Sequence, residues 1–400
     1  MEHSKRNKCS ACGTSNTNHS LLLISDLLDE TIGRIGRVTL NIFKIDENHA
    51  LFKFFEKFFY KISVLFGFLK YSDDKDKAIT GRSRLIWDEA QRRGIKMQQV
   101  LIFGKPVEHY RAFVNGKYIN FESIPIPPHM SSSGYGWVDD KFILSERLRA
   151  EGIASPSAGS AMLYSTAKNI FNKLEKPVIL KPRSGSRGRH TTTNINTKED
   201  LKKALDLAHM ISLVVVVEEH LFGSVYRATT VDGKLVGFFR ADPPSVIGDG
   251  HSTIDDLIKD KNKNKHERMG NILVDKDALD FLARQSLGTH SILEDGRKVN
   301  LSAKTGRFFG GYTKEMLPEV HPKMHEIFEK AAKIVDIPVA GFDLIIGDPT
   351  LDPGTQRWGI IECNSMPYID LHFYALEGKP INIAECVWDL WKTKGVIKNN

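Results

Sequence analysis

The sequence predicts an α+β fold built on largely antiparallel sheets. Asn115-Gly116 and Asp232-Gly233 each stand between two segments of alternating apolar and polar residues, the pattern of a tight β-hairpin. Asp295-Gly296 marks a further turn, and helical segments such as 197–210 are interspersed with these hairpins. Hairpins mixed with helices favour an α+β arrangement over a doubly wound parallel sheet.

The composition is that of an ordinary globular protein. The chain has 400 residues, of which 41% are hydrophobic and 26% charged, enough for one large lobe or two to three small ones. A net charge of +7 permits a polyanionic partner without selecting one. Four cysteines make no disulfide framework, and the first 20 residues lack the apolar segment of a signal peptide. We therefore expect a cytoplasmic protein.

Residues 1–80 have the character of an N-terminal extension. Their most apolar part, 51–71, reads as a Phe-rich amphipathic helix in which Lys53, Lys57 and Lys61 form a narrow polar stripe. Three lysines make it a poor membrane span. Packing against the same protein or a twin subunit, which would make a homo-oligomer, is the favoured interpretation, and an interfacial membrane helix is the alternative.

A CxxC pair lies near the start of the chain, at Cys9 and Cys12. Two thiolates are half of a zinc site, and His3 and His19 are the nearby side chains that could complete it. A metal or redox role and an unstructured terminus both remain open for this pair.

A new unit begins near residue 81. Residues 81–104 predict a helix followed by a strand, and the hairpin at 115–116 follows. Residues 131–137 read as a loop, and 139–156 as a helix that opens on Asp139 or Asp140.

Strands and helices then alternate to the end of the chain. The expected strands are 176–182, 213–220, the hairpin 228–241, 339–347 and 357–364, and the expected helices are 197–210, 321–336 and 381–392.

A Gly-Ser-Arg segment at 180–190 follows one of these strands. Gly185 and Gly188 free the backbone to bend over an anion, while Lys181, Arg187 and Arg189 add positive charge. The segment matches no established phosphate-loop motif, so a phosphate cover and a plain surface turn fit it equally well.

Two apolar strands carry polar side chains that could meet. In "GIIECN" the alternation of an extended chain points Glu362 and Asn364 to the same face, and pairing with "VAGFDLIIG" can bring Asp343 beside them. Two carboxylates and an amide are hard oxygen ligands that suit Mg²⁺ or Mn²⁺. A partly exposed sheet edge is the alternative for any one of these residues alone.

Five segments in this order resemble the ATP-grasp ligases, and most of all the ATP-grasp module of cyanophycin synthetase and of the bifunctional glutathione synthetases. The resemblance covers about residues 139 to 392. Its segments are "DDKFILSERLRAEGIASP", "VILKPRSGSRGRH", "VVVVEEHLFGSVYR", "PPSVIGDGHSTIDDLI" and "AGFDLI" with "IIECNSMP" and "LHFYALEGKP".

The resemblance implies an ATP-grasp fold, in which two α+β lobes grip ATP. It divides the chain into the extension at 1–80, an α/β N-terminal lobe at 81–138, a central lobe at 139–225 and a C-terminal lobe at 226–400. The chain departs from the family's usual pattern at Val225 and only loosely follows it in "NLSAKTGRFFGG".

Site residues are also implied by the resemblance. Two Mg²⁺ (or Mn²⁺) ions would bind Asp343, Glu362 and Asn364, and Arg227 and Arg307 would face the γ-phosphate or an acyl phosphate. The implied ATP contacts are Lys141 and Lys181 on the phosphates, the covering loop with Ser184, Gly185, Ser186 and Gly188, and Glu218 with the backbone of Glu219, His220 and Leu221 at the adenine.

The activity that the resemblance implies is ATP-dependent ligation of a carboxylate to an amine, through an acyl phosphate, with release of ADP and phosphate. The partners would be small-molecule or peptide substrates. A non-catalytic nucleotide-binding or membrane-docked protein is the alternative. A nucleic-acid partner is not expected, because the basic residues are not interleaved with exposed aromatic ones.

Overall fold

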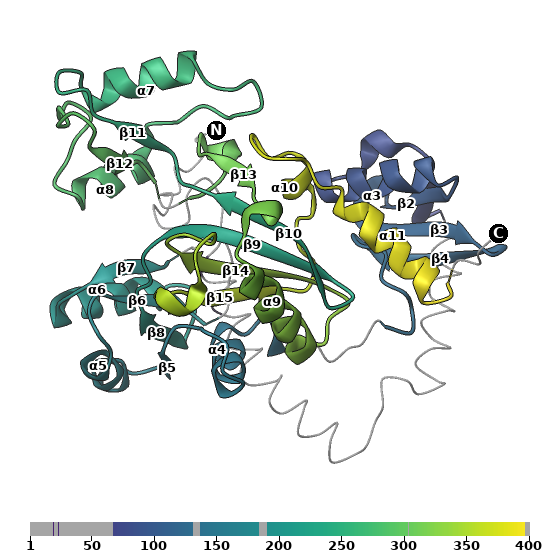
Figure 1. The fold of residues 1–400 in the computed structure, drawn as a ribbon, viewed down its shortest axis with the longest axis horizontal. Helices are drawn as coiled ribbons and strands as arrows, with labels where there is room; N and C mark the ends of the chain where they lie inside the picture. The colour runs from purple at the N-terminus through teal and green to yellow at the C-terminus, as the bar shows by residue number, and fades with distance from the viewer. Residues whose placement is uncertain are drawn as a thin grey trace, which may run out of the picture.

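The computed structural model describes residues 67–130, 137–183, 190–302 and 304–396, together with His19 and Leu23. The predicted α+β class is confirmed, because every strand pairing between named strands in these ranges is antiparallel. Four sheets carry the helices on their faces (Figure 1). None of the described helices is long and apolar enough to cross a membrane.

The N-terminal sheet has the strand order β1-β2-β3-β4. Its strands are β1 (Leu69–Ser72), β2 (Lys96–Ile102), β3 (Lys105–Val114) and β4 (Lys117–Glu122). The expected hairpin at Asn115-Gly116 joins β3 to β4, and both turn residues have positive φ. The short η2 (Lys75–Lys77) and α3 (Gly81–Arg92) lie between β1 and β2.

One prediction about the extension is wrong at its end. The Phe-rich helix was expected to run to residue 71, but Leu69–Ser72 form β1, which pairs with β2 along its whole length. The segment "LKYS" alternates apolar and polar residues and gains a full ladder of hydrogen bonds at the sheet edge. The rest of that helix and the Cys9–Cys12 pair lie outside the described residues.

A second sheet has the order β5-β8-β6-β7. It is formed by β5 (Ala158–Ala161), β8 (Val215–Glu219), β6 (Val178–Pro182) and β7 (Thr192–Ile195). Two helices, α5 (Tyr164–Lys173) and α6 (Lys198–Ala208), share one apolar core with this sheet. Residues of α6 follow the expected capped pattern, because the Thr197 side chain accepts a hydrogen bond from the Asp200 amide.

The third and largest sheet has the order β13-β10-β9-β14-β15. Its strands are β13 (Thr313–Glu315), β10 (Lys234–Ala241), β9 (Ser224–Val231), β14 (Val339–Ile346) and β15 (Gly359–Asn364). The expected pairing of the last two strands is confirmed. Two helices, α4 (Lys141–Ala150) and α9 (Pro322–Val335), share a core with this sheet, and Asp140 caps α4 by accepting from the amides of Phe142 and Ile143.

A small subdomain is inserted after β10. It contains β11 (Ser245–Ile247), α7 (Ile254–Lys263), α8 (Lys276–Ala283) and β12 (Lys298–Asn300), with a core of its own. The remaining short elements are η4 (Arg307–Phe309), η5 (Leu317–Glu319), η6 (Pro353–Thr355) and α10 (Asp370–Phe373).

The last helix, α11 (Ile383–Thr393), packs against α3 and shares an apolar core with the N-terminal sheet, and it also contacts α10, β9 and β10 (Figure 1). Trp388 and Trp391 are fully buried there, and their indole nitrogens donate to the carbonyls of Ile86 and Pro125. One apolar core therefore joins the residues around α3 to the far end of the chain.

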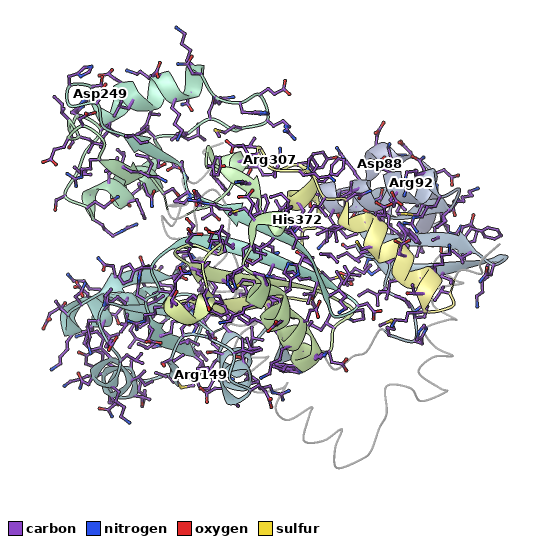
Figure 2. The ribbon with its side chains drawn as sticks, in the orientation of Figure 1. Asp88, Arg92, Arg149, Asp249, Arg307 and His372 are labelled. Atoms are coloured by element: carbon purple, nitrogen blue, oxygen red, sulfur yellow. The ribbon has the colours of Figure 1, made fainter. Side chains whose placement is uncertain are left out.

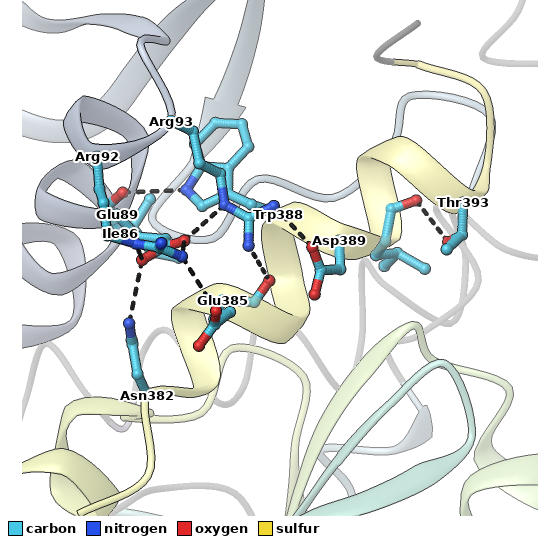
Figure 3. A network of polar contacts seen from close by, with 10 residues as sticks. Ile86, Glu89, Arg92, Arg93, Asn382, Glu385, Trp388, Asp389 and Thr393 are labelled. Atoms are coloured by element: carbon cyan, nitrogen blue, oxygen red, sulfur yellow. Dashed lines mark hydrogen bonds and ion pairs between the residues drawn. The ribbon is translucent and has the colours of Figure 1, made fainter. Parts of the chain in front are cut away.

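A polar network closes the same junction (Figure 3). The buried carboxylate of Glu89 on α3 accepts hydrogen bonds from Arg92, Arg93 and Asn382, and Arg93 also pairs with Asp389 on α11. Burial tends to raise the pKa of Glu89, but the hydrogen bonds from the two arginines outweigh it and hold this pKa below its ordinary value of 4.5.

Candidate active site

Three neighbouring strands bring together residues from distant parts of the sequence. Arg227 on β9 lies opposite Asp343 on β14, and Asp343 lies opposite Glu362 on β15. Asn364, two residues beyond Glu362, is 3.5 Å from an Asp343 oxygen through its amide nitrogen. The three expected metal ligands are therefore adjacent.

A bulge in β15 decides which way these side chains point. Ile360 pairs with Leu344 and Glu362 with Asp343, so Ile361 is an extra residue without an opposite partner. The side chains of both Ile360 and Cys363 consequently enter the apolar core, while Glu362 and Asn364 are only half-buried. Burial raises the pKa of the Cys363 thiol well above its usual range.

The Arg227 guanidinium binds both oxygens of Asp343. Its Nε donates to Oδ1, and its Nη2 donates to Oδ2 at 2.7 Å. Burial tends to lower the pKa of Arg227, but the Asp343 carboxylate outweighs this effect and raises it. Gly341 leaves room for the Arg227 side chain, because a Cβ at position 341 would lie 3.2 Å from Arg227 Cδ and 2.6 Å from Pro367 Cβ.

Lys141 approaches the same group of residues from the first position of α4. Its Nζ lies 3.8 Å from an oxygen of Glu362, the only ion pair formed by that carboxylate among the described residues. Burial raises the pKa of the neighbouring Asp139, with Lys141 acting in the opposite direction. The sequence pattern marked Asp139 only as a possible helix start.

The residues expected at the nucleotide lie on the second sheet. Lys181 and Glu218 are both buried, and the lysine donates to Oε1 of the carboxylate at 2.6 Å. Glu219 accepts a hydrogen bond from the Ser157 amide at 2.7 Å and forms an ion pair with Arg357. Burial tends to raise the pKa of Glu219, but these two interactions outweigh it and lower the pKa. Leu221 is buried, and burial lowers the pKa of His220. Ser184, Gly185, Ser186 and Gly188 lie outside the described residues.

One link between these groups was missed from the sequence. Arg183, directly after β6, donates to Asp140 through its Nε at 2.8 Å and its Nη2 at 2.7 Å. Asp140 caps α4, which begins with Lys141, while β6 carries Lys181. The pair therefore ties together the two elements that hold the lysines; the arginine in "LKPRSG" is the only sequence signal for it.

Arg307 lies in η4 and has different neighbours. Its Nη1 is 3.4 Å from the Arg268 carbonyl, and its guanidinium lies over the Phe308 and Tyr374 rings. Burial lowers its pKa, and the nearby Asp370 carboxylate opposes that effect. The structure shows no hydrogen bond or ion pair from Arg307 to Arg227 or to the expected metal ligands within the described ranges.

The donor set fits Mg²⁺ or Mn²⁺. Among the described residues no three His, Cys, Asp or Glu side chains gather as a metal cluster, but Asp343, Glu362 and Asn364 offer two carboxylates and an amide, all with hard oxygen donors. Both Asp343 oxygens already accept from Arg227, and each carboxylate oxygen has a second lone pair that an ion could use.

Comparisons with known proteins place this arrangement in context. No family model matches the chain. Cyanophycin synthetase of Geminocystis herdmanii is 33% identical over 262 residues, which is 63% of this chain and 30% of that protein. The glutathione biosynthesis bifunctional protein GshAB of Clostridium perfringens is 27% identical over 262 residues, 63% of this chain and 34% of that protein. The chain thus spans about a third of the length of these relatives.

A solved structure agrees in fold. A bifunctional glutathione synthetase from Pasteurella multocida superposes with a TM-score of 0.54 and 22% identity, covering 77% of this chain and 43% of that one. The expected α+β ATP-grasp fold is confirmed, as is the resemblance to ATP-grasp ligases of the cyanophycin synthetase and bifunctional glutathione synthetase type.

Proposed function

We propose that this chain, which resembles the ATP-grasp ligases in sequence and fold, is an ATP-dependent ligase that joins a carboxylate to an amine. The reaction would proceed through an acyl phosphate and release ADP and phosphate. The observation that carries the proposal is the row of Arg227, Asp343 and Glu362 across three neighbouring strands, with Asn364 beside it.

The chemistry explains why such a row is needed. A carboxylate is a poor acylating agent, and transfer of the γ-phosphoryl group to it creates a good leaving group. The protein's share is mainly to position the reactants and to neutralise the charge that develops on the phosphates. No side-chain nucleophile is required.

Asp343, Glu362 and Asn364 would hold Mg²⁺ or Mn²⁺, two ions in all. When bound, the metal supplies positive charge to the phosphate oxygens. Arg227 would hold Asp343 in place through its two hydrogen bonds and offer its remaining Nη1, which is buried and has no hydrogen-bond partner among the described residues. An unpartnered N–H at this position is suited to a phosphate or acyl-phosphate oxygen.

Lys141 and Lys181 would bind the ATP phosphates, covered by the loop that contains Ser184, Gly185, Ser186 and Gly188. The Lys181–Glu218 pair supports this role, because a buried carboxylate fixes the position of the lysine. Glu218, Glu219, His220 and Leu221 would line the adenine site at the end of β8, and Arg307 would face the acyl phosphate.

The substrates would be a small-molecule or peptide carboxylate and an amine. We further propose a cytoplasmic location and no nucleic-acid partner. We also propose that the chain self-associates through residues 51–66. Binding of the same residues to a membrane surface is the alternative.

A screen for ADP release tests the proposed function. The full chain is incubated with ATP, Mg²⁺ and pairs of amino acids or short peptides, and mass spectrometry looks for a product equal to the sum of both substrates less one water. Glu122→Gln is the matched control for a Glu362→Gln variant, because Glu122 is an exposed residue of β4 in a different sheet. No ADP release and no condensed product with any pair would contradict the proposal.

A further inference from the structure

Asp370, the first residue of α10, has a buried carboxylate with one oxygen, Oδ1, that lacks a hydrogen-bond partner in the described parts of the chain. Asp370 is only 7% exposed. The ion pairs seen in those parts include none to Asp370.

The other buried carboxylates of the described chain are all paired. Glu89 accepts from two arginines, Glu218 from Lys181 and Asp242 from Arg240. Glu315 accepts from the Phe238 and Leu317 amides and contacts His372. A buried carboxylate oxygen without a hydrogen-bond partner is costly in free energy, and Asp370 also forms no ion pair among the described residues, so its retention points to a ligand rather than to the fold.

The surroundings of Asp370 define what could bind there. Its Oδ2 lies against Gly81, the first residue of α3, so closely that a side chain at Gly81 would overlap it. Burial raises the pKa of Asp370, and a hydrogen bond from its own amide acts in the opposite direction, as do the nearby Arg82, Arg307 and His372. Arg307, in η4, and His372, in α10, are both labelled near the centre of Figure 2.

The carboxylate is tied to the proposed active site by a short, anchored segment. Five residues separate Asn364 from Asp370. Within them, the Met366 carbonyl accepts from Arg82 Nη1, and Pro367 packs on Gly341 beside Arg227. Tyr368, next to the Arg82 guanidinium, is exposed, so the segment between Asn364 and Asp370 reaches the protein surface at this residue.

We propose that Asp370 binds the amino group of the amine substrate and accepts its proton. The negative charge of Asp370 would repel a carboxylate ligand. A primary ammonium group, in contrast, can donate a hydrogen bond to Oδ1 and form an ion pair with the carboxylate. Arg307, the residue proposed to face the acyl phosphate, lies near enough to influence Asp370 electrostatically. The inference rests on the proposed function.

The ammonium group gives one proton to Asp370, and the free amine attacks the acyl carbon. A C–N bond forms and the C–O bond to phosphate breaks, with the electron pair leaving on phosphate. The second proton lost by the nitrogen goes to the departing phosphate, and Asp370 then returns its proton to water.

Stability measurements separate this role from a structural one. Asp370→Asn should be at least as stable as the wild type to urea, because it removes an unpaired buried charge while keeping the shape. Asp242→Asn is the matched control and should lose stability, since Asp242 is equally buried but paired with Arg240. A loss for Asp370→Asn as large as that of the control would overturn the proposal.

Two partial reactions then test the chemistry. Hydroxylamine, a nucleophile that is uncharged at neutral pH, traps an acyl phosphate without an ammonium group. With the substrate pair most active in the wild type, Asp370→Asn should form hydroxamate at the wild-type rate, and amide about 100-fold more slowly with a raised KM for the amine.

The outcomes distinguish the two proposals. Equal loss of hydroxamate and amide in Asp370→Asn, or loss of neither, would refute the role of Asp370 and leave the ligase intact. A wild type that forms neither product with any pair would refute the proposed function, and the amine-binding role with it.

Discussion

Arg227 and Asp343 face each other across the β9–β14 ladder, and one guanidinium binds both oxygens of the carboxylate. The fork of the guanidinium matches the two oxygens, so the pair fixes the rotation of the carboxylate as well as its charge. Asp343 thereby presents its remaining lone pairs toward β15, where Glu362 and Asn364 lie.

We expect Arg227→Ala to lower the free energy of unfolding by about 2–3 kcal/mol, because Asp343 loses two hydrogen bonds in a largely buried position. Urea unfolding measures the loss. Arg227→Lys should recover only part of it, since an ammonium group cannot bind both oxygens in the same way. Full recovery by lysine would contradict the bidentate role.

We expect Glu362→Gln and Asn364→Ala to reduce ATP turnover by about 100-fold or more while the protein stays folded. Each change removes an expected metal donor, but the apolar side of β15, with Ile360 and Cys363, is unchanged. ADP release at saturating Mg²⁺ is the measurement, with circular dichroism as the check on folding. Unchanged turnover in either variant would rule out this metal site.

We expect Lys181→Ala to weaken nucleotide binding and to destabilise the second sheet by about 3–5 kcal/mol, because Glu218 is left buried without its partner. Calorimetry with a non-hydrolysable ATP analogue and urea unfolding report the two effects. The double variant Lys181→Ala/Glu218→Gln should regain stability but not affinity. Equal affinity in the wild type and Lys181→Ala would show that the lysine serves elsewhere.

We expect the contribution of Glu89 to stability to depend on pH. Its folded-state pKa lies below the ordinary value of 4.5, so the contribution is complete above that pH and is lost as the pH falls through the folded-state pKa. Glu89→Gln should therefore cost about 2 kcal/mol near neutral pH and progressively less in acid. Urea unfolding at several pH values checks this; a cost independent of pH would contradict it.

We expect two truncations of the N-terminal extension to differ. Deleting residues 1–75 removes β1 and exposes the edge of β2, which should lower the melting temperature and promote aggregation. Deleting residues 1–66 keeps β1 and tests the rest of the extension, including the Phe-rich segment. Size-exclusion chromatography and co-sedimentation with anionic vesicles then follow self-association and membrane binding. A full-length monomer that pellets with vesicles would favour the membrane alternative.

Local patterns predicted much of the large sheet. The Asp232-Gly233 turn, the strands 339–347 and 357–364 and their pairing all depend on residues close in sequence or on strong apolar alternation, and the structure confirms them. The adjacency of Asp343, Glu362 and Asn364 followed from that pairing.

Features set by long-range packing could not be predicted in the same way. The bulge at Ile361 lies inside a regular pattern, and only its fit to β14 reveals it. The Lys181–Glu218 pair depends on the register of β6 against β8. Asp370 belongs to no sequence motif, and it is buried by α3, which lies over 280 residues away in the sequence. Whether the remaining site residues bind ATP or metal stays a prediction.

The docking of α11 on the N-terminal sheet affects how the chain can be synthesised. The contact from Trp388 to Ile86 spans 302 positions, so the core around α3 stays incomplete until α11 has left the ribosome. During that interval Phe121 lacks the ring contacts that it makes with Trp388 and Trp391 in the folded protein. The N-terminal sheet, which is translated before the second and third sheets, therefore completes its core only after they have been translated, and a nascent chain stalled before residue 383 would present that incomplete apolar core to chaperones and proteases.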